Sequence, residues 1–213
     1  NLKLFQVTNT DFYKKNKDSV KKIINFLKKN IKNYDLVLIH DFGHEMFKEE
    51  IIKFIEKHHH KVCLNVQTNS TNIGYNYITK YSKVNYFSID EPEARLACQS
   101  RSNLINDLYD ALVEKIKFKY GTITCGNNGA HIFDNKKKKT HFCPALDKRP
   151  IDTLGAGDAF FSISSLFSAV SSEPETILLT GNIAGSIKIR SLGHRKYITQ
   201  EEFINTSKSI FNF

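Results

Sequence analysis

The residues best placed to do chemistry in this sequence are three small residues followed by a carboxylate: Gly155, Ala156, Gly157 and Asp158. The next stretch, residues 159–167, is apolar or small and lacks Gly and Pro, as a buried helix would be. A helix start offers unpaired backbone N–H groups and the positive end of a dipole, which together bind anions. An acid beside such a site could deprotonate a hydroxyl while a phosphoryl group arrives. The alternative is a Gly-rich turn in which Asp158 is an ordinary first-turn acid.

Residues 152–161 as a whole resemble the second signature of the PfkB, or ribokinase-like, carbohydrate kinases, and the match is contiguous. The resemblance implies that Asp158 takes the proton from the sugar hydroxyl. It also implies that residues 155–157 donate N–H groups to the charge on the transferred phosphoryl group, and that Asp152 and Thr153 hold a monovalent cation such as potassium. The motif Gly-x-x-x-x-Gly-Lys-Ser/Thr is absent, so the sequence does not indicate a P-loop kinase.

Two acidic residues that follow a predicted strand are candidates for a metal site. Asp90 and Glu93 stand where ribokinase-like enzymes carry an Asn-x-x-Glu motif, with Asp90 in place of the Asn. In that family the motif orders Mg²⁺ and its waters beside the ATP phosphates, which suits the preference of magnesium for oxygen ligands. The alternative is an acidic helix N-terminus that the helix dipole favours.

Residues 124–129 follow another predicted strand and resemble the Thr-x-Gly-x-x-Gly loop of the same family. The resemblance implies that Thr124, Gly126 and Gly129 let the backbone lie against ATP, and that Asn182 lies near the adenine. Without the resemblance the loop is a hairpin turn and Asn182 is an amide that packs between helices.

A third group of polar residues follows the first two predicted strands and could bind the acceptor: Asp41, Gly43, Asn65, Gln67 and Asn69. Amides bind sugar hydroxyls or phosphate, but they also satisfy loop backbones, and both interpretations remain open. These segments resemble the heptose-phosphate kinase branch of the family, with its relatives fused to sugar nucleotidyltransferases. His44 stands where that branch has Lys in an Asp-Tyr-Gly-Lys loop.

The elements that must position these groups alternate along the chain. Short apolar runs predict strands over residues 35–40, 62–66, 84–89, 120–125, 130–133 and 140–144, the last two forming a hairpin. Helical spacing predicts helices over residues 18–30, 46–58, 104–116, 156–170, 173–190 and 200–211, with a short helix or turn within 73–81. This alternation predicts an α/β fold, a three-layer sandwich with a mostly parallel sheet. Ligands bind such sheets beyond the carboxyl ends of the strands, where the candidate segments fall.

Composition narrows the class of protein further. With 213 residues, 40% of them hydrophobic, the chain can bury one substantial core, and we expect a single ribokinase-like domain over residues 1–213. We find no apolar run long enough for a membrane helix and no secretory signal. The four cysteines are scattered, which favours reduced thiols in a cytoplasmic protein. The net charge of +9 is spread over several predicted helices, so we expect neither a nucleic-acid nor a membrane partner.

Residue 1 is Asn and the only methionine is Met46, so we expect the sequence to be a fragment. The resemblance covers residues 35–213, the C-terminal two thirds of such a kinase. It implies that the lid strands, the first Gly-Gly signature and most sugar contacts belong to a missing N-terminal portion. It further implies a homodimer formed through the lid, and a fusion to a nucleotidyltransferase module.

These observations together predict an ATP-dependent phosphotransferase that acts on a hydroxyl of a sugar or sugar phosphate, with ATP, Mg²⁺ and a monovalent cation as cofactors. Such a fragment could be inactive by itself. A nucleoside or vitamin kinase of the same fold is one alternative, since the motifs indicate ATP use and not the acceptor. A binding subunit without catalytic activity is another alternative. A chain that had lost its activity in evolution should have lost Asp158 and the neighbouring glycines first, and these residues are present.

Overall fold

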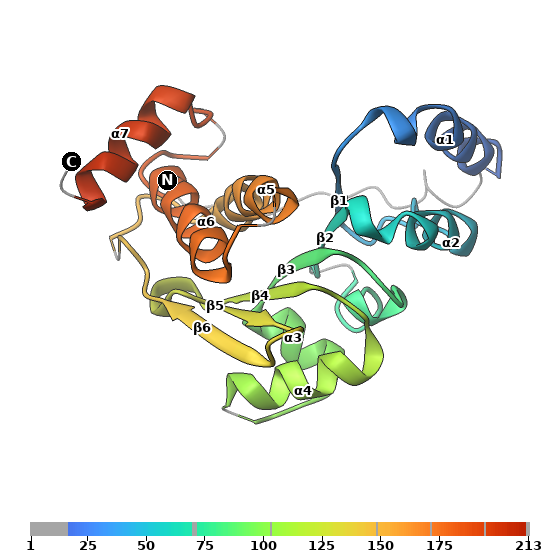
Figure 1. Ribbon diagram of the computed structural model, residues 1–213, viewed down its shortest axis with the longest axis horizontal. Coiled ribbons are helices and arrows are strands. Elements are labelled where there is room, and N and C mark those ends of the chain that lie inside the picture. The colour runs from blue at the N-terminus through green and yellow to red at the C-terminus, as the bar shows by residue number, and fades with distance from the viewer. Residues whose placement is uncertain are drawn as a thin grey trace.

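A mostly parallel sheet runs through the part of the chain that the computed structural model describes, which is residues 17–69, 72–102, 104–147, 149–170, 172–193 and 195–211. Its strands lie side by side in chain order (Figure 1). They are β1 (Val37–Asp41), β2 (Val62–Val66), β3 (Tyr86–Asp90), β4 (Tyr120–Thr124), β5 (Ala130–Asp134) and β6 (Lys139–Cys143). The first four pair in parallel, and β5 and β6 form an antiparallel hairpin at one edge. The carboxyl ends of β1 to β4 therefore meet at one edge of the sheet.

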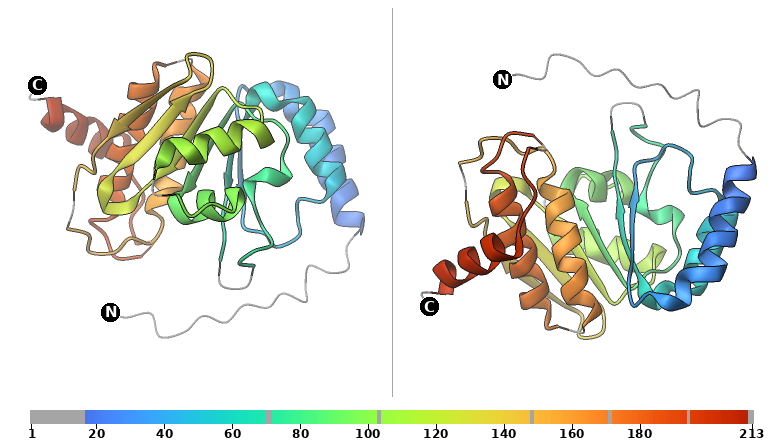
Figure 2. Two further views of the ribbon diagram at one scale, coloured as in Figure 1. Left: turned by 90° about the horizontal axis from the view of Figure 1, so that it is seen from below. Right: turned by 90° about the horizontal axis from the view of Figure 1, so that it is seen from above.

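Seven helices of the described residues accompany the sheet: α1 (Lys17–Asn30), α2 (Glu49–Lys57), α3 (Glu91–Cys98), α4 (Ile105–Lys115), α5 (Ala156–Ala169), α6 (Pro174–Lys188) and α7 (Gln200–Phe211). Short 3₁₀ turns are η2 (Ile31–Asn33), η3 (His59–Lys61), η4 (Ile78–Lys80) and η5 (Gly126–Asn128). Figure 2 shows α3 and α4 on one face of the sheet and α5 and α6 on the other. This arrangement confirms the predicted three-layer sandwich.

Two apolar cores separate these layers. One is formed by the sheet with Ile51 of α2 and Leu108 and Leu112 of α4, and side chains of α1 pack against it. The other joins the opposite face of the sheet to Phe161 of α5 and Ile177 of α6. Strand β2 is buried at all five positions because helices cover both faces of the sheet, and a covered parallel strand reads as a continuous apolar run.

Helices α5 and α6 pack closely against each other near the carboxyl edge of the sheet. A Cβ atom added at Gly181 would lie 2.7 Å from the ring of Phe160, so only glycine leaves room for this ring. Buried hydroxyls tie α5 to the sheet, since Tyr86 Oη of β3 lies 2.9 Å from Ser164 Oγ and 3.0 Å from Thr122 Oγ1 of β4. The N-terminus of α5 is thereby held at the carboxyl edge of the sheet.

The observed elements follow the predicted ones closely, with two clear differences: α3 was not among the predicted helices, and α2 begins later than predicted. The sequence predicts a helix from residue 46, whereas α2 begins at Glu49. The chain turns before it: Glu45 adopts a left-handed conformation with φ 58°, and Lys48 is extended. Helical spacing alone does not report such a turn.

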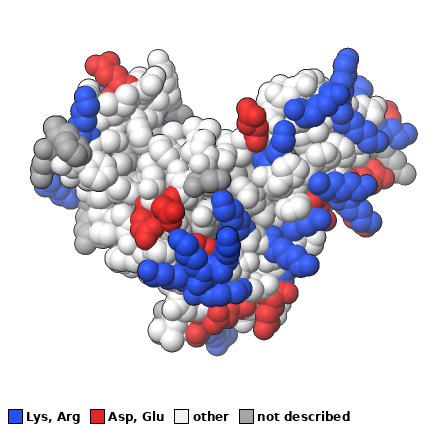
Figure 3. Space-filling view, viewed as in Figure 1, with Lys and Arg blue, Asp and Glu red and all other residues white. Residues whose placement is uncertain are grey.

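Charged side chains of both signs are spread over the face shown in Figure 3, where lysine and arginine lie beside acidic residues in several places. None of the helices in the described part of the chain combines the length and apolar character needed to cross a bilayer.

Candidate active site

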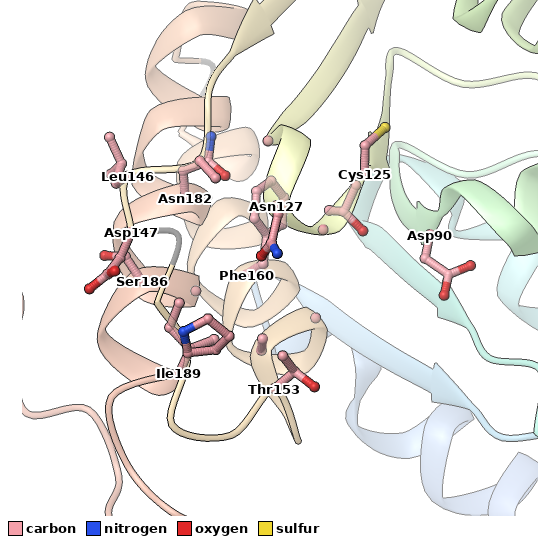
Figure 4. Close-up of a pocket in the computed structure, with 18 of the residues that line it drawn as sticks. Asp90, Cys125, Asn127, Leu146, Asp147, Thr153, Phe160, Asn182, Ser186 and Ile189 are labelled. Carbon is pink, nitrogen blue, oxygen red and sulfur yellow. The ribbon is translucent and has the colours of Figure 1, made fainter. Parts of the chain in front are cut away.

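A pocket of about 530 Å³ opens at the carboxyl edge of the sheet (Figure 4). One side is formed by the β3–α3 junction with Asp90 and by the β4–β5 turn with Cys125 and Asn127. The other side is formed by α6 with Asn182 and by the segment after β6 with Leu146. Helix α5 supplies a third wall from its first turns. The pocket is therefore bounded by segments that are far apart in sequence.

The N-terminus of α5 presents backbone N–H groups to this pocket. Gly155 is the N-cap residue and adopts a left-handed conformation with φ 78°, which glycine reaches without steric cost. The N–H of Ala156 donates to Thr153 O at 3.2 Å, so one of the three predicted donors already has a protein partner. Within the described part of the chain, neither the N–H of Gly155 nor that of Gly157 donates to a protein acceptor. The predicted anion site therefore consists first of these two groups.

Asp158 lies on the side of α5 that faces away from this pocket. The described pocket lining includes Gly157 but not Asp158. The Asp158 carboxylate is 40% exposed and faces the ends of β1 and β2, where Gln67 Nε2 donates to its Oδ1 at 2.5 Å and His40 Nδ1 lies 3.4 Å away. Gln67 Nε2 is also 2.9 Å from Asn65 Oδ1. Two consecutive residues of one helix turn thus face two different spaces.

Asp90 and Glu93, the predicted magnesium ligands, form a capping box at the start of α3. Asp90 Oδ1 accepts from Glu93 N at 2.8 Å, and Glu93 Oε2 accepts from Asp90 N at 3.0 Å. Glu93 Oε1 accepts from Thr68 N at 2.7 Å. Burial, with the neighbouring Asp90 charge, raises the pKa of Glu93 to about 7, and burial also raises the pKa of Asp90. Each carboxylate thus has a structural role.

The donor set still fits a magnesium ion that keeps most of its waters. Asp90 lines the pocket, and a carboxylate oxygen that accepts one N–H retains a further lone pair. The described residues contain no cluster of three His, Cys, Asp or Glu side chains that could cage a metal by themselves. Water and phosphate oxygens would have to complete the coordination, as is usual for magnesium.

The four residues predicted to bind nucleotide, Thr124, Gly126, Gly129 and Asn182, all line the pocket. Gly129 has φ 97°, and an added Cβ would lie 2.2 Å from Cys143 O, so this glycine lets the β4–β5 turn pass close to β6. Asn182 Nδ2 donates to Cys143 O at 3.3 Å. Its amide therefore holds the segment after β6 against α6, and contact with an adenine remains a prediction.

The predicted acceptor residues divide into buried and accessible groups. Asp41 is only 2% exposed, and its carboxylate accepts from Tyr81 Oη at 2.8 Å and Gly43 N at 2.9 Å and pairs with Lys80. Asn65 is buried and donates to Ser88 O at 2.8 Å. Both side chains are thus engaged in contacts within the protein, and acceptor binding by either residue remains a prediction.

Two other predicted acceptor residues belong to the same loop packing. Gly43 has φ 71°, and an added Cβ would collide with the side chains of Asn72 and Asn76. Asn69 Nδ2 donates to Phe42 O at 3.1 Å. Gln67 remains the predicted acceptor residue that reaches Asp158 directly.

Asp152 and Thr153, the predicted monovalent-cation residues, lie in the loop that leads into α5. Asp152 Oδ1 accepts from Leu154 N at 3.0 Å, and Oδ2 accepts from Gly193 N at 2.9 Å. Thr153 lines the pocket. The loop is thus fastened to the segment that follows α6.

Several pocket residues were not predicted from the sequence. Gly185, Ser186 and Ile189 follow Asn182 at intervals that place them on one face of α6, so Asn182 could have indicated them. Phe160 and Leu146 also line the pocket, and their apolar character gave no signal of a site. On the other side of α5, the predictions omitted His40, whose ring meets the edge of Phe161 at a centroid distance of 4.9 Å.

The chain combines a mostly parallel sheet with a glycine-capped helix, α5, whose N-terminus lies between a pocket and the Asp158 carboxylate. This arrangement is that of the ribokinase-like class predicted from the sequence, and comparison with known families agrees with it. Residues 6–200 match the pfkB family carbohydrate kinases, and the chain belongs to this family. The match begins earlier than the resemblance over residues 35–213 and ends at residue 200, where α7 begins.

The curated relatives lie in the branch that the sequence resembles. The bifunctional protein HldE of Aliarcobacter butzleri (strain RM4018) is 28% identical over 188 residues, which cover 84% of this chain and 37% of the relative. HldE of Sulfurimonas denitrificans (strain ATCC 33889 / DSM 1251) is 26% identical over 181 residues, 83% of this chain and 36% of the relative. The chain therefore spans little more than a third of the length of these relatives.

Solved structures support the fold. Ribokinase of Arabidopsis thaliana complexed with ribose and ATP superimposes with a TM-score of 0.68 at 16% identity, over 90% of this chain and 59% of that chain. Phosphofructokinase-2 of Escherichia coli in complex with potassium gives a TM-score of 0.68 at 17% identity, over 90% of this chain and 63% of that chain. At these identities the likeness establishes the ribokinase-like fold alone.

Proposed function

We propose that this chain is the nucleotide-binding and catalytic part of an ATP-dependent kinase whose acceptor is a hydroxyl of a sugar or sugar phosphate. The observation that carries the proposal is the position of the α5 N-terminus between two spaces. Gly157 lines a pocket on one side, and Asp158 meets the ends of β1 and β2 on the other. A phosphoryl group passing from one space to the other would cross the positive end of the helix.

ATP would occupy the pocket beside α6. Its base and ribose would lie among the walls formed by Leu146, Phe160 and Ile189, which offer apolar surface on one side of the pocket. The triphosphate would point toward Gly155 and Gly157, whose N–H groups favour negative charge. The pocket is of the size typical for small-molecule sites.

The acceptor hydroxyl would lie against Asp158. The Asp158 carboxylate would accept the proton, while the amide of Gln67, just after β2, would hold the carboxylate in place and the ring of His40 in β1 would limit its movement. Positioning of the hydroxyl in line with the phosphoryl group supplies much of the rate, as it does in other phosphoryl transfers.

Asp90 and Glu93 would hold Mg²⁺ through its waters at the pocket edge. When bound, the ion neutralises charge on the phosphates. The two backbone hydrogen bonds of Glu93 fix its carboxylate, so the position of the metal would follow the capping box of α3.

A heptose phosphate is the acceptor that we favour, because the curated relatives named HldE align with most of this chain. At 26–28% identity, the likeness alone is not enough to assign the substrate of these relatives to this chain. Their names therefore guide the choice of compounds in the assay.

The test is phosphoryl transfer from ATP to a panel of sugars, sugar phosphates and nucleosides, measured with the natural full-length protein. We expect transfer to at least one sugar phosphate. Asp158→Asn should lower the rate by about 10²- to 10⁴-fold, the usual contribution of a general base, without changing ATP affinity. Asp110→Asn, on the exposed face of α4, is the matched control and should keep the full rate. Near-normal transfer by folded Asp158→Asn would refute the mechanism, and transfer to nucleosides alone would refute the acceptor class.

A further inference from the structure

A buried lysine lies behind the loop that leads into the anion site. Lys188 is the last residue of α6 and is 7% exposed, and no other lysine of the described residues is buried to this degree. Its Nζ donates to Gly193 O at 2.5 Å. Burial of an ammonium is unfavourable unless oxygen atoms surround it, so such a position calls for a specific partner or role.

The partner of this ammonium belongs to a network that ends at the anion site. Gly193, which gives its carbonyl to Lys188, donates its own N–H to Asp152 Oδ2 at 2.9 Å. Asp152 Oδ1 accepts from Leu154 N at 3.0 Å, and Leu154 immediately precedes Gly155, the N-cap of α5. The N–H groups of Leu154 and Gly193 lower the pKa of Asp152, and the charge of Lys188 lowers it further.

The same residues would be the place for a monovalent cation. The family resemblance assigns such an ion to Asp152 and Thr153, and a solved structure of similar fold is described as a complex with potassium. Potassium requires several carboxylate or carbonyl oxygens. Here the ammonium of Lys188 already donates to Gly193 O, and Gly193 N donates to Asp152, so a potassium ion at these oxygens would lie beside a positive charge. The donor set therefore does not suit an additional cation, because a positive charge is already built in.

We propose that the ammonium of Lys188 takes the place of a monovalent cation behind the anion-binding loop, so that this chain binds nucleotide without potassium. A lysine ammonium is a compact, oxygen-seeking charge with three donors, and its chemistry resembles that of a small bound cation. It stabilises Asp152 and the Gly193 carbonyl in their present positions and thereby fixes the loop that presents Gly155. This inference rests on the proposed function, since it concerns the same anion site.

The experiment compares potassium chloride with choline chloride at equal ionic strength, in the presence of magnesium. Two quantities are measured: the affinity for a non-hydrolysable ATP analogue, by calorimetry, and the thermal midpoint of the protein without nucleotide. The variants are Lys188→Met, which removes the ammonium and keeps an unbranched side chain, and Lys208→Met on the exposed face of α7 as the matched control.

We expect the natural chain and Lys208→Met to show the same affinity and midpoint in both salts. Lys188→Met should bind the analogue about tenfold more weakly in choline, the usual effect of losing a charged hydrogen bond, and potassium should restore most of the loss.

Two results would overturn the inference. One is a saturable increase of affinity or midpoint with potassium in the natural chain, and the other is Lys188→Met behaving like Lys208→Met in both salts. If Lys188→Met does not fold, the salt comparison on the natural chain decides. If the natural chain binds no ATP analogue at all, the proposed function fails, while the thermal midpoints in the two salts still test the role of Lys188.

Discussion

At the scale of single residues, Gly157 and Asp158 divide the site between them. They are consecutive on α5, so their directions differ by about 100° around the helix axis. Gly157 contributes bare backbone to the pocket, and Asp158 contributes a carboxylate to the opposite space. Exchange of the two would place negative charge where phosphates are expected. The order of the two residues therefore matters as much as their types.

This division predicts an unusual result for Gly157→Ala. An added Cβ would meet no atom within 4 Å, so the folded protein has room for it. Alanine also favours helix over glycine, and the free energy of unfolding should stay the same or rise by up to about 1 kcal/mol. The methyl group would occupy space that a phosphate needs, so affinity for an ATP analogue should fall about tenfold or more. Urea denaturation and calorimetry measure the two effects separately, and unchanged affinity would place the phosphates elsewhere.

Single residues also show where sequence reasoning about the site reached its limit. The type and spacing of Asp41 and Gln67 made both candidates for acceptor binding. The structure surrounds Asp41 with Tyr81, Lys80 and a backbone N–H, whereas Gln67 reaches Asp158. A sequence reports which groups can form hydrogen bonds. It does not report whether distant residues such as Tyr81 have already satisfied them.

At the scale of elements, the packing of α5 against α6 determines the width of the pocket. Phe160 of α5 lines the pocket and rests on Gly181 of α6. The α6 face that continues through Asn182, Gly185 and Ser186 forms part of the same wall. A larger residue at position 181 would push the two helices apart and displace this wall.

We therefore expect Gly181→Ala to destabilise the protein although alanine is the better helix former. The new Cβ would lie 2.7 Å from the Phe160 ring, and overpacking of this kind costs about 1–3 kcal/mol. Gly185→Ala on the same helix is the control, because its Cβ would meet only Ala156 O at 3.9 Å. Urea denaturation of both variants checks the prediction. Equal stability of the two proteins would show that the helices adjust without strain.

The elements themselves were largely predictable because burial leaves a pattern in the sequence. Strand β2 matches its predicted bounds, since Lys61 and Gln67 flank a fully buried run. The close approach at Gly181 was not predictable, because it depends on which helix turns meet in space. The same holds for the contact between the α5 N-terminus and the ends of β1 and β2.

At the scale of the whole molecule, this chain supplies more of the walls of the pocket proposed for ATP than of the space beside Asp158. The described lining of the pocket proposed for ATP comes from the β3–α3 junction, the end of β4, the β4–β5 turn, the segment after β6, α5 and α6. The space beside Asp158 is bordered by His40 and Gln67, and β1 is the edge strand of the sheet that the described residues form. In a relative more than twice as long, other segments could contribute to this space.

This difference predicts that the chain binds nucleotide more tightly than acceptor. Affinity depends on how many groups are already held in the bound geometry, and the ATP pocket has its glycine turn, its helix N-terminus and its apolar wall in place. We expect a non-hydrolysable ATP analogue to bind this 213-residue chain at least about tenfold more tightly than any sugar phosphate, as measured by calorimetry. Asp158→Asn should leave the nucleotide affinity unchanged, because its carboxylate faces the other space. Tight binding of a sugar phosphate without binding of the analogue would reverse the assignment of the two spaces.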